Sequence, residues 1–173
     1  QVVMEKLRAR TQGLVGPIGP HCDPGAPFVP RLPAHYVARP DLMNSLGEII
    51  LSPSSDMCLC AVTGRTAGVG IHGMGGIGKT VIATALADSP AVRRRFEKRI
   101  VWLTLGQYPD LMERQREAAV QLGQSTFYCK DLQHGRAQLA RLLQKGPTLL
   151  ILDDVWKMEH LEAFDIVRDD SRL

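Results

Sequence analysis

Gly73-Met74-Gly75-Gly76-Ile77-Gly78-Lys79-Thr80 matches the pattern G-x-x-x-x-G-K-[ST] at every fixed position. Glycines in this pattern let the backbone curve around a phosphate and point successive N–H groups at it. The Lys79 ammonium adds a charge at the β- and γ-phosphates, and the Thr80 hydroxyl is placed to ligate Mg²⁺. The stretch predicts a phosphate-binding loop for a nucleoside di- or triphosphate. The residues expected to contact the nucleotide here are Gly73, Met74, Gly75, Gly76, Ile77, Gly78, Lys79, Thr80 and Val81.

The residues on either side of this loop fit a strand before it and a helix after it. Residues 67–72 form a short apolar run that suits a buried strand. Within residues 79–87, Ile82 and Leu86 lie one helical turn apart, so we expect a helix that begins at about Gly78 and points its positive end at the phosphates. An accidental match by a glycine-rich turn is the alternative, and the order of strand, loop and helix disfavours it.

A second stretch, residues 148–154 (Thr-Leu-Leu-Ile-Leu-Asp-Asp), is an apolar run that ends in two carboxylates. A strand buried on both faces has such a run, and open α/β sheets bind ligands at the carboxyl ends of their strands. This Walker B arrangement predicts that Asp153 holds Mg²⁺ together with Thr80 and that Asp154 orients or deprotonates an attacking water, which makes Asp154 and Lys79 the candidate catalytic residues. The alternative is a pair of acids that only starts a turn.

Composition restricts the class of protein. The chain has 173 residues, enough for one core of ordinary size, and its net charge of +3 is too small to argue for a nucleic-acid partner. No apolar run approaches the ~20 residues that span a bilayer. The four cysteines form no C-x-x-C pair, so neither a disulfide framework nor a zinc site is indicated, and a reducing cytoplasmic location is expected.

The chain divides into a linker and a domain. Residues 13–40 contain seven of the eleven prolines, which is typical of an interdomain linker. Residues 1–10 resemble the tail of a helix from an upstream domain, and the first residue is Gln rather than Met, so we expect part of a longer protein. The predicted division is a linker over residues 1–28 and a partial nucleotide-binding domain over residues 29–173.

Helical and strand signals alternate along that domain. A capping box at Asp110 and Glu113 starts one helix, and Gly123 stops it. Gly146 and Pro147 terminate another helix before the apolar strand at residue 148. The expected helices cover residues 40–50, 110–122 and 134–144, a further strand covers residues 99–105, and an amphipathic stretch covers residues 160–167.

Two other features have both a plain and a functional interpretation. The basic run at residues 93–95, with Lys98 and Arg99, is expected to be a solvated turn, with contact to nucleic acid or an acidic partner as the alternative. Trp156 follows the two carboxylates and is expected to pack under the rim of the sheet, with stacking on a ligand as the alternative.

Several segments together resemble the NB-ARC nucleotide-binding domain, the switch module of the apoptotic protease-activating factor and of plant disease-resistance proteins, within the signal-transduction ATPases with numerous domains. The resemblance spans about residues 29–173. The strings that carry it are Val29-Pro30, Tyr36-Val37-Ala38-Arg39, Ile71 to Thr80, Val101-Trp102-Leu103 and Leu149 to Trp156.

This resemblance implies an α/β P-loop NTPase fold, a three-layer sandwich with a mostly parallel sheet. It implies tight binding of ADP or ATP with Mg²⁺, slow hydrolysis, nucleotide-controlled assembly into a homo-oligomer and signalling partners bound through other domains. It also places Val37 and Arg39 at the adenine side of the nucleotide. Direct contact with membrane or nucleic acid is not expected.

The resemblance further implies that Leu173 precedes a family strand that lies between the P-loop strand and the strand ending at Asp153. The sheet is therefore expected to be incomplete, with unpaired edges on both of those strands. Two other functions fit a P-loop: a kinase-like phosphotransferase, which needs a substrate pocket and an arginine-rich lid, and an ATP-dependent transcription activator of the same ATPase class.

Overall fold

The computed structural model describes residues 28–51, 57–61 and 78–164. Residues 28–39 contain no helix or strand. The elements that follow are α2 (Pro40–Leu51), β1 (Met57–Ala61), α3 (Lys79–Asp88), α4 (Pro90–Phe96), β2 (Ile100–Gly106), α5 (Leu111–Gln121), α6 (Leu132–Leu143), β3 (Thr148–Val155) and α7 (Met158–Glu162).

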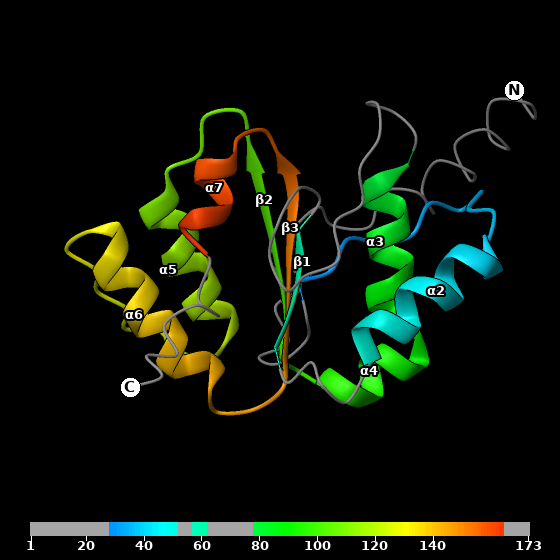
Figure 1. The fold of residues 1–173 in the computed structure, drawn as a ribbon, viewed down its shortest axis with the longest axis horizontal. Helices are drawn as coiled ribbons and strands as arrows, with labels where there is room; N and C mark the ends of the chain where they lie inside the picture. Colours follow the sequence, from blue (N-terminus) through cyan, green and yellow to red (C-terminus); the bar gives the residue numbers. More distant parts are fainter. Residues whose placement is uncertain (1–27, 52–56, 62–77, 165–173) are drawn as a thin grey trace, which may run out of the picture.

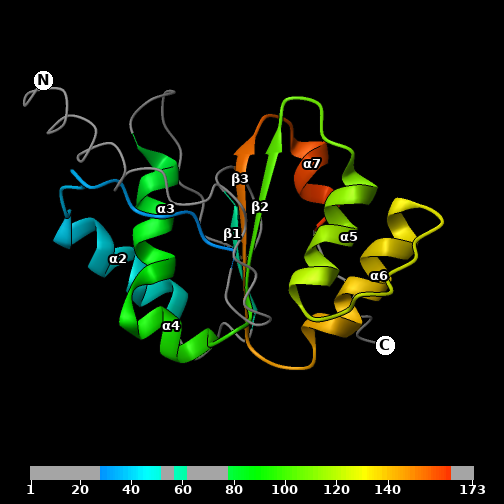
Figure 2. The same ribbon diagram turned by 180° about the vertical axis from the view of Figure 1, so that it is seen from behind.

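The three described strands form a parallel sheet in the order β1-β3-β2 (Figure 1). Helices α2, α3 and α4 cover one face of this sheet, and α5, α6 and α7 cover the other, as the opposite view also shows (Figure 2). The expected α/β sandwich with a parallel sheet is confirmed. None of the helices in the described ranges is long and apolar enough to cross a membrane.

Strand β3 supplies the core on both faces of the sheet. Successive residues of a strand point to opposite faces. Accordingly, Leu149 and Ile151 pack with the cluster that includes Leu86 and Phe96, whereas Leu150 and Leu152 belong to the cluster on the α5–α7 side. The uninterrupted apolar run is therefore explained by burial on both sides.

Side-chain caps set the starts of two helices. The Asp110 carboxylate accepts a hydrogen bond from the backbone N–H of Glu113 at 3.1 Å, which confirms the predicted start of α5. The Asp131 carboxylate accepts from the N–H of His134 at 2.7 Å. Because Asp131 is the cap, α6 begins at Leu132, two residues earlier than predicted.

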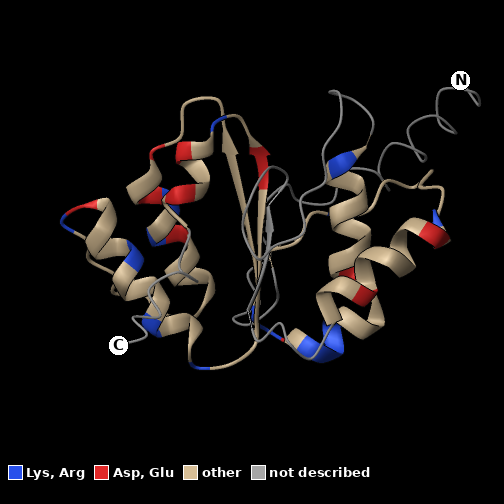
Figure 3. Ribbon diagram, viewed as in Figure 1, with Lys and Arg blue, Asp and Glu red and all other residues tan. Residues whose placement is uncertain are grey.

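The basic run at residues 93–95 is helical, so its prediction as a turn was wrong. Ser89 caps helix α4 by accepting from the N–H of Val92 at 3.4 Å, and Pro90 occupies the first turn, where its missing N–H costs nothing. Arg93 pairs with Asp88 at 2.9 Å. Figure 3 shows these cations at the end of the sheet opposite the acidic tip of β3.

The expectation of an unpaired β3 edge was also wrong. Strand β3 is paired with β1 on one side and with β2 on the other, over five and six residue pairs. The predicted strand at residues 67–72 lies outside the described residues, as do residues 1–27 and 165–173. Of the amphipathic stretch predicted for residues 160–167, residues 160–164 contain the end of α7 and the buried Phe164, and residues 165–167 lie outside the described residues.

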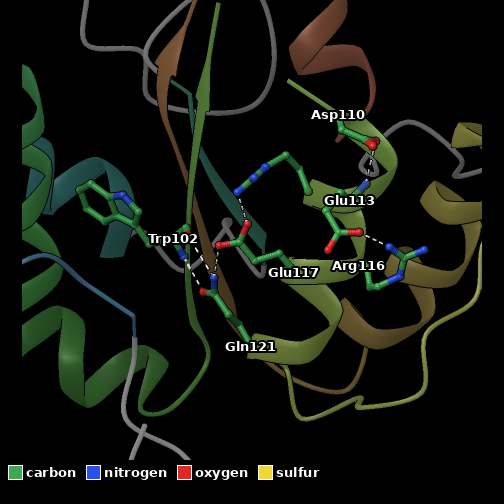
Figure 4. Close-up of polar contacts among 7 residues, drawn as sticks. Trp102, Asp110, Glu113, Arg116, Glu117 and Gln121 are labelled. Atoms are coloured by element: carbon green, nitrogen blue, oxygen red, sulfur yellow. Dashed lines mark hydrogen bonds and ion pairs between the residues drawn. The ribbon is translucent and has the colours of Figure 1, made fainter. Parts of the chain in front are cut away.

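The backbone of β2 at Trp102 is hydrogen-bonded to the side chain of Gln121 (Figure 4). The Trp102 N–H donates to Oε1 of Gln121, and Nε2 of Gln121 donates to the Trp102 carbonyl, both at 2.9 Å. Gln121, at the end of α5, thus satisfies two backbone groups as a neighbouring strand would. This protects the β2 edge from pairing with another chain.

Arg99 fixes the amino ends of β2 and β3 to the end of α6. Its Nε donates to Oγ1 of Thr148 at 3.0 Å, and its Nη2 donates to the Leu142 carbonyl at 2.8 Å. Burial lowers the pKa of the Arg99 guanidinium. Arg99 therefore has a structural role, not the role in a solvated basic turn that the sequence suggested.

Gly135 makes room for a buried amide that joins three elements. Gln115 of α5 is fully buried, and its Nε2 donates to the carbonyls of Leu132 at 3.1 Å and Ala163 at 2.8 Å. A Cβ at position 135 would lie 1.9 Å from Oε1 of Gln115. This contact has to be relieved by moving a packed side chain or a helix.

We therefore expect Gly135→Ala to lower the free energy of unfolding by about 1–3 kcal/mol, as overpacking does in other cores. Gly47→Ala is the matched control, because a Cβ at that site in α2 meets nothing within 4 Å. Higher helix propensity should make the control neutral or up to about 1 kcal/mol more stable. Urea unfolding of both variants checks this, and equal stabilities would contradict the packing argument.

Candidate nucleotide-binding site

Helix α3 begins at the end of the phosphate-binding motif. Gly78 is its N-terminal cap, with φ 86° in the left-handed region that glycine adopts without strain. No side chain caps this end, and the first bond of the helix runs from the N–H of Ile82 to the Gly78 carbonyl at 2.9 Å. The early N–H groups of a helix have no partner within it and form a site for anions. The predicted helix start is confirmed.

Thr80 and Asp153 meet at this end of the sheet although 73 residues separate them. The Thr80 hydroxyl donates to Oδ1 of Asp153 at 2.9 Å and lies 3.2 Å from Oδ2. Asp153 is 8% exposed near the end of β3. The hydroxyl of Thr84, one turn along α3, donates to the Thr80 carbonyl at 2.8 Å. The two residues predicted to hold the metal are thus in direct contact.

The donor atoms of this pair fit Mg²⁺. Mg²⁺ prefers oxygen ligands and usually takes one or two carboxylates, with phosphate and water oxygens completing its octahedron. Asp153 supplies a partly desolvated carboxylate and Thr80 a hydroxyl, both beside the start of α3. Lys79 is the first residue of that helix. In Figure 3 the cation at the start of α3 and the acidic tip of β3 lie at the same end of the sheet.

Asp154 differs from Asp153 in exposure and in partners. It is exposed, its φ is 56°, and its Oδ1 accepts a hydrogen bond from Nε1 of Trp156 at 3.0 Å. Its Oδ2 lies near Gly106 at the end of β2, since a Cβ built on Gly106 would be 4.0 Å from this oxygen. The two adjacent carboxylates therefore face different surroundings.

The expectation that Trp156 packs under the rim of the sheet was wrong. Its side chain is 60% exposed and contacts the Asp154 carboxylate. The indole N–H is bonded instead to the exposed Asp154 carboxylate, whose residue has a left-handed backbone just before β3 ends at Val155. Sequence analysis gave Thr84 and Gly106 no role at the site, and for Trp156 it suggested only stacking on a ligand, as the alternative to packing. Only Thr84 had a readable signal, its position four residues after Thr80 on the same helix.

The other predicted site residues are placed as follows. Gly73, Met74, Gly75, Gly76 and Ile77 lie outside the described residues, and Val81 lies in the first turn of α3. The Val37 side chain is 79% exposed, and Arg39 is also exposed, with its carbonyl accepting from the N–H of Met43 at the start of α2. Within the described residues, the Arg39 side chain has no hydrogen bond or ion pair.

Comparison with known proteins agrees with this geometry. The model of the NB-ARC domain family matches residues 58–173, more than half of the chain. Apoptotic protease-activating factor 1 of Danio rerio is 30% identical over 149 residues, and that of Homo sapiens is 30% identical over 146 residues, which cover 80% and 79% of this chain. A probable disease resistance protein of Arabidopsis thaliana is 36% identical over 94 residues, 54% of this chain.

The chain spans only 10% to 11% of the length of these relatives. The matched region nevertheless contains α3, which follows the phosphate-binding motif, and β3, which bears both carboxylates. This chain belongs to the NB-ARC domain family of P-loop nucleotide-binding proteins.

Proposed function

We propose that this chain is the switch domain of a signalling ATPase, which binds ADP or ATP with Mg²⁺ and hydrolyses ATP slowly. The observation that carries the proposal is the contact between Thr80 and Asp153, which joins the end of the phosphate-binding motif to the acidic strand. The similarity to proteins named for apoptotic protease activation and disease resistance supports a role in signalling.

Each proposed nucleotide contact has its own chemical role. Backbone N–H groups of Gly73 to Gly78 and of the start of α3 surround the phosphates, and Lys79 neutralises the β- and γ-phosphates. Thr80 and Asp153 would hold Mg²⁺, which would offset the negative charge of the phosphates. The backbone at Val37 and Arg39 reads the edge of adenine.

For hydrolysis we propose that Asp154 positions and deprotonates a water. The water oxygen forms a bond to the γ-phosphorus while the bond from that phosphorus to the β–γ bridging oxygen breaks. The electron pair of the broken bond leaves with ADP, and the proton of the water passes to the Asp154 carboxylate and then to solvent. Exposure of Asp154 suits this role, because the carboxylate must reach water.

We further propose that residues 29–173 form part of a domain whose bound nucleotide controls self-association of the full-length protein, with residues 1–28 as a linker. The names of the relatives support a function that acts on other proteins, because a protease-activating factor has a protease as its target. The nucleotide state would then be read by other domains and by signalling partners.

The dependence of nucleotide binding on Mg²⁺ tests the metal site. In the full-length protein, Thr80→Val should keep the size of the side chain and remove one metal ligand. We expect ADP to bind the wild type about tenfold more tightly with Mg²⁺ than with a chelator, and the variant to lose most of that difference. Thr126→Val, at an exposed threonine far from α3 in sequence, is the control. An unchanged Mg²⁺ effect in Thr80→Val would argue against the metal site.

A further inference from the structure

The indole of Trp156 is exposed and yet has a defined polar partner. Its side chain is 60% exposed. Its Nε1 donates to Oδ1 of Asp154 at 3.0 Å. We propose that Trp156 is a positioning residue for ATP hydrolysis, which holds the Asp154 carboxylate in the orientation that accepts the proton of the attacking water. This inference rests on the proposed hydrolytic function.

Asp154 combines an unusual backbone conformation with a side chain that is held by one hydrogen bond. Its φ of 56° lies in the left-handed region, which is uncommon for residues other than glycine, and strained conformations of this kind concentrate at functional sites. An exposed carboxylate after such a turn can rotate about its side-chain bonds. The hydrogen bond from Trp156 fixes one oxygen and so removes that freedom.

The second oxygen of Asp154 remains available. Within the described residues, Oδ2 has no hydrogen-bond partner, and it faces Gly106 at the end of β2. A Cβ at position 106 would lie 4.0 Å from Oδ2, which is an ordinary van der Waals contact, and the φ of 75° at Gly106 is one that glycine adopts without strain. One oxygen is thus held by the indole, and the other can accept a proton.

An indole suits this task better than a cation does. Its N–H is a donor only, carries no net charge and does not release its proton near neutral pH. Trp156 can therefore orient the carboxylate without adding a positive charge, which would stabilise the anion and make it a weaker base. Asp153 has a separate partner, the Thr80 hydroxyl, so each of the two adjacent acids is held by a different neighbour.

The test is Trp156→Phe in the full-length protein, because phenylalanine keeps an aromatic ring and lacks the N–H. We expect kcat for ATP hydrolysis to fall about tenfold while the Kd for ATP stays within twofold, since general-base catalysis is sensitive to orientation. Trp156→Leu, which also lacks the donor, should behave in the same way. Tyr108→Phe, at an 84% exposed residue that follows β2, is the control and should leave kcat unchanged.

A double-mutant cycle with Asp154→Asn separates this inference from the proposed function. If Trp156 acts through Asp154, Trp156→Phe should cause no further loss in an Asp154→Asn protein. Full kcat in both Trp156 variants, a tenfold loss that persists in the Asp154→Asn background, or a loss that appears as weaker ATP binding would each overturn the inference. An Asp154→Asn protein with wild-type kcat would instead overturn the proposed role of Asp154 itself.

Discussion

Lys79→Ala is expected to weaken the binding of ADP or ATP about 100-fold. The variant removes a charge-assisted contact to the phosphates, worth about 2 to 3 kcal/mol or more, from the first residue of α3. Helix α3 begins with a glycine cap and has no side-chain cap, so the remaining attraction comes from backbone N–H groups and the helix dipole. Calorimetric titration of the full-length protein with nucleotide measures the difference.

Lys98→Ala is the matched control for this titration. Lys98 is an exposed cation in the turn between α4 and β2, at the end of the sheet opposite Lys79. Its removal changes the net charge by the same amount and should leave nucleotide affinity within twofold. Equal affinity for the wild type and Lys79→Ala would show that the phosphates lie elsewhere.

Asp154→Asn is expected to lower kcat for ATP hydrolysis by about 10² to 10⁴-fold, the usual contribution of a general base, with ATP still bound. Asparagine tolerates the left-handed backbone at this position and retains an oxygen that can accept from Trp156, so the local structure should persist. Steady-state hydrolysis and an independent binding titration separate the two effects.

Asp153→Asn supplies the contrast for this experiment. Asp153 is buried and accepts from Thr80, so its carboxylate is placed to bind the metal in the proposed site. The substitution should therefore mainly reduce Mg²⁺-dependent binding. If the two substitutions gave the same loss of affinity and of kcat, the division of roles between the adjacent carboxylates would be refuted.

The features that were predicted correctly have recognisable sequence patterns. The apolar run of β3 reflects burial on both faces. The start of α5 is indicated by the capping residue Asp110 and by Glu113 three residues later. The meeting of Thr80 with Asp153 was also foreseeable, because a phosphate-binding loop and the carboxyl end of an acidic strand must share one nucleotide. These patterns indicate the layers of the fold and the contact between Thr80 and Asp153.

The features that were missed have no sequence pattern that indicates them. The pairing of β1 with β3 was missed because the sequence of residues 57–61 does not indicate which strand they pair with. Gly106 gains its place beside Asp154 only because β2 and β3 end together. Trp156 is exposed and donates to Asp154, whereas an aromatic residue after a strand ordinarily favours packing.

A crystal structure of the full-length protein with ADP and Mg²⁺ tests the central claim most directly. The account predicts the phosphates at the start of α3 and the metal 2.0–2.1 Å from the Thr80 hydroxyl, with Asp153 bound to the metal directly or through water. The present hydrogen bond between Thr80 and Asp153 should then be replaced by contacts to the metal. Nucleotide bound away from α3, or an unchanged contact between Thr80 and Asp153 with the metal elsewhere, would contradict it.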